Sequence, residues 1–93
     1  MTDFEPIVDV TSVRVVSRYI VEVGFADGEL KVVDLEPHLW GEAFEPLLQD
    51  YELFCAVAVD EDAGTITWPN GADISPRALY QEGRPAVPRP AAV

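Results

Sequence analysis

Apolar and polar side chains alternate most clearly between residues 19 and 34, and the pattern predicts a β-hairpin. Asp27 and Gly28 separate the two alternating runs, and Asp-Gly is a strong hairpin signal because both positions of a two-residue turn adopt positive φ. In the register that this loop sets, Lys31 lies on the face of Glu22, diagonal to it. The opposite face then carries four apolar side chains, with Phe25 opposite Leu30 and Val23 opposite Val32.

Two further segments have the composition of strands. Residues 7–17 are rich in Val and Thr, and their apolar positions change parity near Ser12, which indicates either a β-bulge or burial on both faces. Residues 56–68 predict a second hairpin, in which the loop 60–64 joins two short strands. The sheet therefore contains about five strands, namely two hairpins and an N-terminal strand.

The period of two is lost over residues 35–56, which predict a loop followed by short helices. Pro46 suits the first turn of a helix, and Asp50 is suited to cap a second helix over residues 51–56. The loop carries three large apolar side chains that we expect to fold onto the core: Leu39, Trp40 and Phe44. With one more helix near the end of the chain, the predicted fold class is α+β, with a small antiparallel sheet and two or three short helices.

The segment 67–80 reads TWPNGADISPRALY and gathers several polar side chains around a turn. Pro69 ends the preceding strand, and Asn70 with Gly71 forms the turn. Ser75 is a favoured N-cap, followed by proline at the first position of a helix that runs to about residue 81. Most polar residues of this segment therefore have a structural role, whereas Asp73 and Arg77 have none that is evident.

The end of the chain has a different composition. Residues 82–93 are rich in proline and contain no large apolar side chain that could offset the entropy of ordering them. We therefore predict a single folded domain over residues 1–81 and a disordered tail over residues 82–93.

Charge and composition exclude some classes of function. The 93 residues include 17 acidic and six basic side chains, for a net charge of −11. Such a surface repels phosphate backbones, so we expect no direct binding to nucleic acid and favour a protein partner, with a basic one as an option. The sequence has no apolar run of about 20 residues that would span a membrane. A single cysteine and the lack of a signal-peptide pattern predict a cytoplasmic protein.

Catalytic and metal-binding motifs are weak in this sequence. Cys55 and His38 could form a nucleophilic pair, but the apolar neighbours of Cys55 predict a buried, unreactive thiol. One cysteine and one histidine do not make a transition-metal site. The acidic loop from Asp60 to Asp62 lacks the glycine and glutamate of an EF-hand, and weak cation binding there stays open. We assign no catalytic, cofactor-binding or metal-binding residue and expect no cofactor.

Four short motifs resemble one family. They are V-x-F-x-D-G with V-D-L over residues 23–35, G-x-x-F-x-P-L over 41–47, G-T-I-x-W-P-N-G-A-D over 64–73 and P-x-x-L-Y over 76–80. On these motifs the chain resembles the DUF2442 family of small bacterial domains of unknown function, over about residues 7–80. The resemblance implies a small α+β domain built on antiparallel strands, with no catalytic residue to carry over.

The resemblance also bears on function. Some members of the family resemble the first half of a protein with a C-terminal helix-turn-helix, and no such pattern follows Tyr80 here. Others lie beside a second small domain, in an arrangement similar to a toxin–antitoxin pair.

Two functional interpretations follow. The first is a non-enzymatic protein-interaction module, which could be one half of a toxin–antitoxin-like or regulatory pair. Its candidate partner-binding residues are Pro69, Asn70, Gly71, Asp73, Arg77 and Tyr80, since a fixed turn and Tyr or Arg side chains favour an interface. The alternative is a small ligand-binding domain or enzyme that uses Asp73 with neighbouring carboxylates. The alternative requires Asp73 to lie in a concave pocket with other polar groups.

Overall fold

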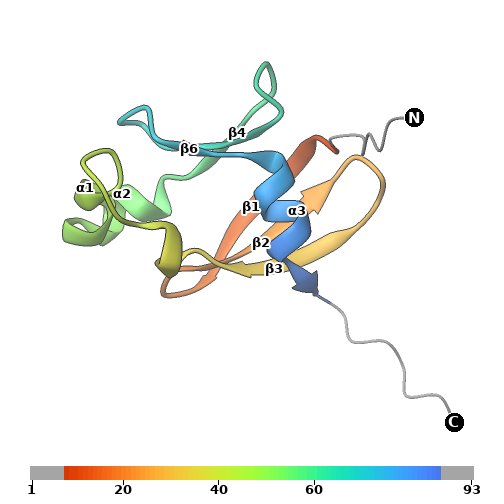
Figure 1. The fold of residues 1–93 in the computed structure, drawn as a ribbon, viewed down its shortest axis with the longest axis horizontal. Coiled ribbons are helices and arrows are strands. Elements are labelled where there is room, and N and C mark those ends of the chain that lie inside the picture. The colour runs from red at the N-terminus through yellow and green to blue at the C-terminus, as the bar shows by residue number, and fades with distance from the viewer. Residues whose placement is uncertain (1–7, 87–93) are drawn as a thin grey trace, which may run out of the picture.

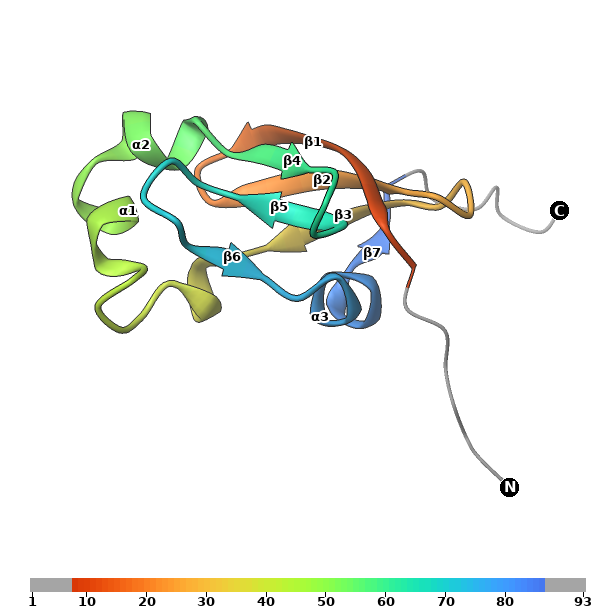
Figure 2. The same ribbon diagram turned by 90° about the horizontal axis from the view of Figure 1, so that it is seen from above.

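The computed structural model describes residues 8–86, which form two antiparallel sheets lying over one another, with short helices beside them (Figures 1 and 2). One sheet has the strand order β1-β2-β3-β7 and the other β4-β5-β6. In chain order the elements are β1 (Val10–Ser17), β2 (Ile20–Phe25), β3 (Leu30–Asp34), the 3₁₀ helix η1 (Glu36–His38), α1 (Glu45–Gln49), α2 (Tyr51–Cys55), β4 (Ala58–Asp60), β5 (Thr65–Thr67), β6 (Asp73–Ile74), α3 (Pro76–Glu82) and β7 (Arg84–Pro85). The α+β class is confirmed, although the predicted single sheet is divided in two.

The first strand contains the irregularity that its sequence predicts. The pairing of β1 with β2 shifts between Val10 and Ser12, which confirms a bulge at this point. Beyond the bulge, Val13 and Val15 are half-buried against the core, and Arg14 lies between them on the opposite face. Because of this bulge, apolar side chains before it (Val10) and after it (Val13 and Val15) all face the core.

The β2–β3 hairpin has a different register from the predicted one. Its loop contains three residues rather than two, because the amide of Phe25 donates to the carbonyl of Glu29 at 2.9 Å. Gly28 takes the positive φ of 91° that closes such a loop, and an oxygen of Asp27 accepts from the Glu29 amide at 2.9 Å. Val23 therefore pairs with Lys31.

This shift of one residue reverses the face of every side chain in β3. The predicted pairs of Phe25 with Leu30 and of Val23 with Val32 are wrong, and Leu30 is 40% exposed. Lys31 and Val33 lie on the same face of β3, which α3 covers, whereas Glu22 lies on the opposite face of the sheet. Arg14 pairs with Glu22 instead, with Nε and Oε1 separated by 2.9 Å.

The predicted helix caps are confirmed. The carboxylate of Asp50 accepts from the amides of Glu52 and Leu53 at 3.1 and 3.3 Å, which starts α2. Ser75 Oγ accepts from the amides of Arg77 and Ala78 at 3.2 and 3.5 Å, which starts α3.

The loop before α1 follows its prediction only in part. Leu39 is buried and Phe44 is half-buried, as expected. Trp40 is 75% exposed, so the prediction that it folds onto the core is wrong. The reason is geometric, since Leu39 occupies the core position and the next side chain of the loop turns outward.

The chain after α3 is ordered further than its composition predicts. Arg84 pairs with Val32 in β3, and the amide of Ala86 donates to the Leu30 carbonyl at 2.9 Å. A sheet edge binds backbone groups and needs no large apolar side chain, and proline is tolerated in such an edge strand. The prediction of disorder is therefore wrong for residues 82–86. The rest of the predicted tail, residues 87–93, lies outside the described residues, as do residues 1–7.

The core lies between the two sheets and is closed by α2 and α3. Its fully buried side chains are Val21, Val23, Leu35, Leu47, Phe54, Ile66 and Leu79. The indole of Trp68 is buried beside them, and its Nε1 donates to the Phe54 carbonyl at 2.9 Å. Among the described residues, no buried side-chain nitrogen or oxygen lacks a hydrogen-bond partner.

The two tryptophans provide a matched test of this core. Replacing Trp68 by alanine removes a buried ring and its hydrogen bond, and should lower the free energy of unfolding by about 3–5 kcal/mol. Replacing the exposed Trp40 by alanine should change it by less than about 0.5 kcal/mol. Urea denaturation followed by circular dichroism measures both. An equal loss in the two variants would mean that Trp40 packs against the core.

Candidate functional site

A groove lies between the loop before α1 and the start of α3, and it includes one of the predicted site residues. Its volume is about 450 Å³. It is lined by His38 and residues 40–44 on one side and by Asp73, Ile74, Ser75 and Ala78 on the other. We call this surface the Trp40 groove, because the most exposed large apolar side chain of the described residues lies along it.

Backbone hydrogen bonds give the loop wall of the groove a defined shape. The carbonyl of Gly41 accepts from the amides of Phe44 and Glu45 at 3.1 and 2.9 Å, and Gly41 has a φ of 90°. Asn70 in the β5–β6 turn donates from Nδ2 to the Ala43 carbonyl at 2.9 Å. The loop that presents Trp40 is therefore tied to the second sheet.

The structure places the predicted partner-binding residues in three locations: the β5–β6 turn, the groove and α3. Pro69, Asn70 and Gly71 are exposed in the β5–β6 turn, where Gly71 has a φ of 91°. The side-chain oxygen of Asn70 accepts from the Ala72 amide at 3.2 Å, so the nitrogen and the oxygen of this side chain both form hydrogen bonds within the fold. Asp73 is exposed and lines the groove, and Arg77 is exposed on the first turn of α3.

Tyr80 has a role that the sequence did not reveal. Its ring is half-buried and meets Phe25 edge to face, with centroids 4.9 Å apart. Its hydroxyl donates to Asp27 Oδ2 at 2.6 Å. Lys31 Nζ lies 3.8 Å from the ring centroid and donates to the Tyr80 carbonyl at 2.7 Å. Tyr80 thus fastens α3 to the β2–β3 hairpin, and we leave it out of the binding surface.

The hydrogen bond between Tyr80 and Asp27 shifts the pKa of both groups. The Tyr80 hydroxyl, followed by the Glu29 amide, lowers the pKa of Asp27 below its ordinary value. The Asp27 carboxylate, followed by burial, raises the pKa of Tyr80 to about 12. The contribution of Asp27 to stability is therefore present above its ordinary pKa and is lost as the pH falls through its lowered folded value. The contribution of Tyr80 is present below pH 10 or so and is lost as the pH rises through about 12.

Titration of the tyrosines tests this contact. Asp27→Asn removes the carboxylate, so the last tyrosine to ionise should do so at lower pH than in the wild type, by ultraviolet absorbance of phenolate. Tyr80→Phe should remove this titration, and Asp73→Asn, in the groove, should leave it unchanged. Circular dichroism must show that each variant is folded over the titration. An unaltered titration in Asp27→Asn would contradict the contact.

The residues considered for catalysis are not brought together. His38 Nε2 lies 2.6 Å from Glu82 Oε1, so His38 is paired with the end of α3. Cys55 is exposed at the end of α2, and the prediction of a buried thiol is wrong because Phe54 takes the core position. Ser75 caps α3 and is used there. No group of three or more potential metal ligands occurs among residues 8–86.

The acidic loop between β4 and β5 is closed by its own hydrogen bonds. Asp60 Oδ1 accepts from the amides of Asp62 and Ala63 at 3.0 and 3.2 Å. This is the arrangement of an acidic hairpin tip in which the first carboxylate stabilises the turn. Weak cation binding at Asp60–Asp62 stays a prediction.

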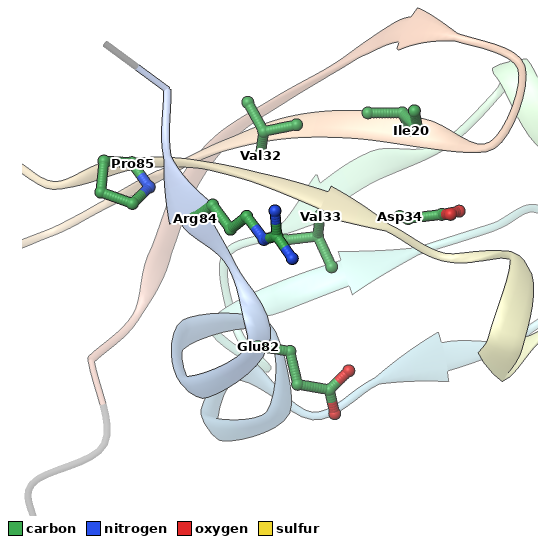
Figure 3. Close-up of a pocket in the computed structure, with 7 residues that line it drawn as sticks. All are labelled: Ile20, Val32, Val33, Asp34, Glu82, Arg84 and Pro85. Atoms are coloured by element: carbon green, nitrogen blue, oxygen red, sulfur yellow. The ribbon is translucent and has the colours of Figure 1, made fainter. Parts of the chain in front are cut away.

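A second hollow lies against the β3–β7 edge of the first sheet, and its Glu82 pairs with His38 of the Trp40 groove. Its volume is about 570 Å³. It is lined by Ile20, Val32, Val33, Asp34, Glu82, Arg84 and Pro85 (Figure 3). Sequence reasoning missed this hollow because it assigned residues 82–86 to a disordered tail and gave β3 the opposite faces.

A family model described as "Protein of unknown function (DUF2442)" matches residues 10–85. The chain belongs to the DUF2442 family. The match ends in β7, so the DUF2442 domain includes the strand that follows α3. No curated protein and no solved structure matches the chain. Among the described residues of this DUF2442 domain, no helix has the length and apolar character to cross a membrane.

Proposed function

We propose that this domain is a non-enzymatic protein-interaction module that binds its partner through the Trp40 groove. The observation that carries the proposal is Trp40 itself, whose side chain is 75% exposed beside a groove. Water contact with an indole is unfavourable, and tryptophan is among the residues that contribute most to binding at protein interfaces. A partner that covers Trp40 would bury its ring.

The loop that carries Trp40 supports this function because it is fixed before any partner binds. The Gly41 carbonyl closes the turn, and Asn70 holds the Ala43 carbonyl from the neighbouring sheet. A surface that is already ordered loses less conformational entropy on binding. The predicted turn at Asn70 and Gly71 therefore contributes by supporting the groove.

Charge favours a basic partner. Glu42 and Asp73 lie on opposite walls of the groove, in a chain of net charge −11. A lysine or arginine of the partner could contact the face of Trp40 and pair with either carboxylate. The acidic surface would also accelerate encounter with a basic protein. On the family resemblance, we propose a partner in a toxin–antitoxin-like or regulatory pair.

One observation favours the alternative, a small ligand-binding domain or enzyme. Asp73 does lie in a concave surface together with His38, Glu42 and Ser75. Against it, His38 is paired with Glu82 and Ser75 caps α3, so two of the three neighbours have partners within the fold. We therefore place the alternative second.

Capture from the host tests the proposal. The wild-type domain, Trp40→Ala and Leu48→Ala serve as bait, because Leu48 is 42% exposed on α1 and outside the groove. We expect a protein that Leu48→Ala retains and Trp40→Ala loses. Calorimetry with that purified protein should show a loss of about 2 kcal/mol or more for Trp40→Ala. Asp73→Asn should weaken binding more at low salt than at high salt.

Two outcomes would contradict this function. Equal capture by wild type and Trp40→Ala would place the partner elsewhere on the surface. Failure to capture any protein, together with amide shifts at Asp73 and Ser75 when host metabolites are added in nuclear magnetic resonance, would favour the small-ligand alternative.

A further inference from the structure

The outer face of the four-stranded sheet is uncovered in the described part of the chain. The other sheet and α3 lie over the opposite face (Figures 1 and 2). Strand register defines a row across the outer face that runs Arg14, Glu22, Val32 and Arg84. Beside this row, Ile20 pairs with Asp34. We call these six residues the outer face.

Apolar side chains form part of this face. Ile20 and Val32 are only half-buried, and Leu30 next to them is 40% exposed. The hollow of about 570 Å³ lies at the edge of this face, where Ile20, Val32 and Arg84 line it together with Val33 and Glu82 (Figure 3). A sheet face with branched apolar residues and a hollow is suited to pack against another surface.

The charges of the outer face differ from those of the whole chain. Two arginines and two carboxylates balance there, whereas the chain has a net charge of −11. Arg14 is paired with Glu22. Arg84 forms no ion pair with any residue from 8 to 86, so its charge is available to a carboxylate of another molecule.

We propose that two copies of this chain associate through their outer faces. A two-fold interface must be self-complementary, and a face with equal numbers of both charges around apolar residues meets this condition. Most other surfaces of so acidic a chain would repel their own copies. The Trp40 groove shares no lining residue with the hollow, and the two meet only where His38 of the groove pairs with Glu82 of the hollow, so we expect the association to leave Trp40 uncovered.

Sedimentation equilibrium of the full chain tests the proposal over protein concentrations from about 1 μM to 1 mM. We expect a reversible monomer–dimer equilibrium. Val32→Glu adds a charge at the centre of the face, and Arg84→Glu reverses the charge at its edge. Each should raise the dimer dissociation constant about tenfold or more. Leu48→Glu, the same kind of change on α1, should leave it unchanged, as should Trp40→Ala.

Arg84 is exposed, so Arg84→Glu decides the matter if Val32→Glu fails to fold by circular dichroism. A monomer at every concentration would overturn the proposal and point to another occupant of the face, such as residues 87–93 of the same chain. A dimer that Arg84→Glu and a folded Val32→Glu both leave intact would also overturn it. Because Trp40→Ala tests the groove alone, failure here is distinct from failure of the proposed function.

Discussion

The register of β3 against β2 is the constraint on which the rest of this structure depends. The loop of three residues at the hairpin tip sends Lys31 toward the core side, where it lies under the ring of Tyr80 and donates to its carbonyl. Asp27 in the same loop accepts the hydroxyl of Tyr80. The hairpin therefore positions α3. The same register turns Leu30 and Val32 outward and leaves the outer face partly apolar.

Both proposed surfaces follow from this arrangement. α3 supplies one wall of the Trp40 groove through Ser75 and Ala78, so the contacts of Lys31 and Tyr80 hold that wall in place. The end of α3 leads into β7, where Arg84 joins the outer face. A single small core thus supports the two proposed binding surfaces, whose hollows share no lining residue.

Local chemistry explains what the sequence could predict. A helix cap needs one side chain and two nearby amides, and both Asp50 and Ser75 were found in this way. The change of parity near Ser12 indicated either a bulge or burial on both faces, and the register of β1 against β2 shows the bulge. Asp73, which had no evident structural role in the sequence, lines the groove, and its part in binding stays a prediction.

Features that depend on contacts distant in sequence could not be predicted. Asp27 and Gly28 fit a loop of two or three residues, and the choice depends on which side of β3 meets the core. Trp40 and Cys55 look like core residues by type, but Leu39 and Phe54 beside them occupy the core. β7 forms because the edge of β3 has backbone groups free to pair. The composition of residues 82–86 does not indicate a strand.

Nuclear magnetic resonance gives the most direct test of the central claim, which is the register of β3. Glu22 and Val32 face one another, so a contact between their Hα protons is expected. The Lys31 side-chain protons should be shifted upfield by the Tyr80 ring and should show contacts to it. Contacts of Val32 with Val23, together with ordinary shifts for Lys31, would mean that β3 has the opposite register and that both surfaces are misplaced.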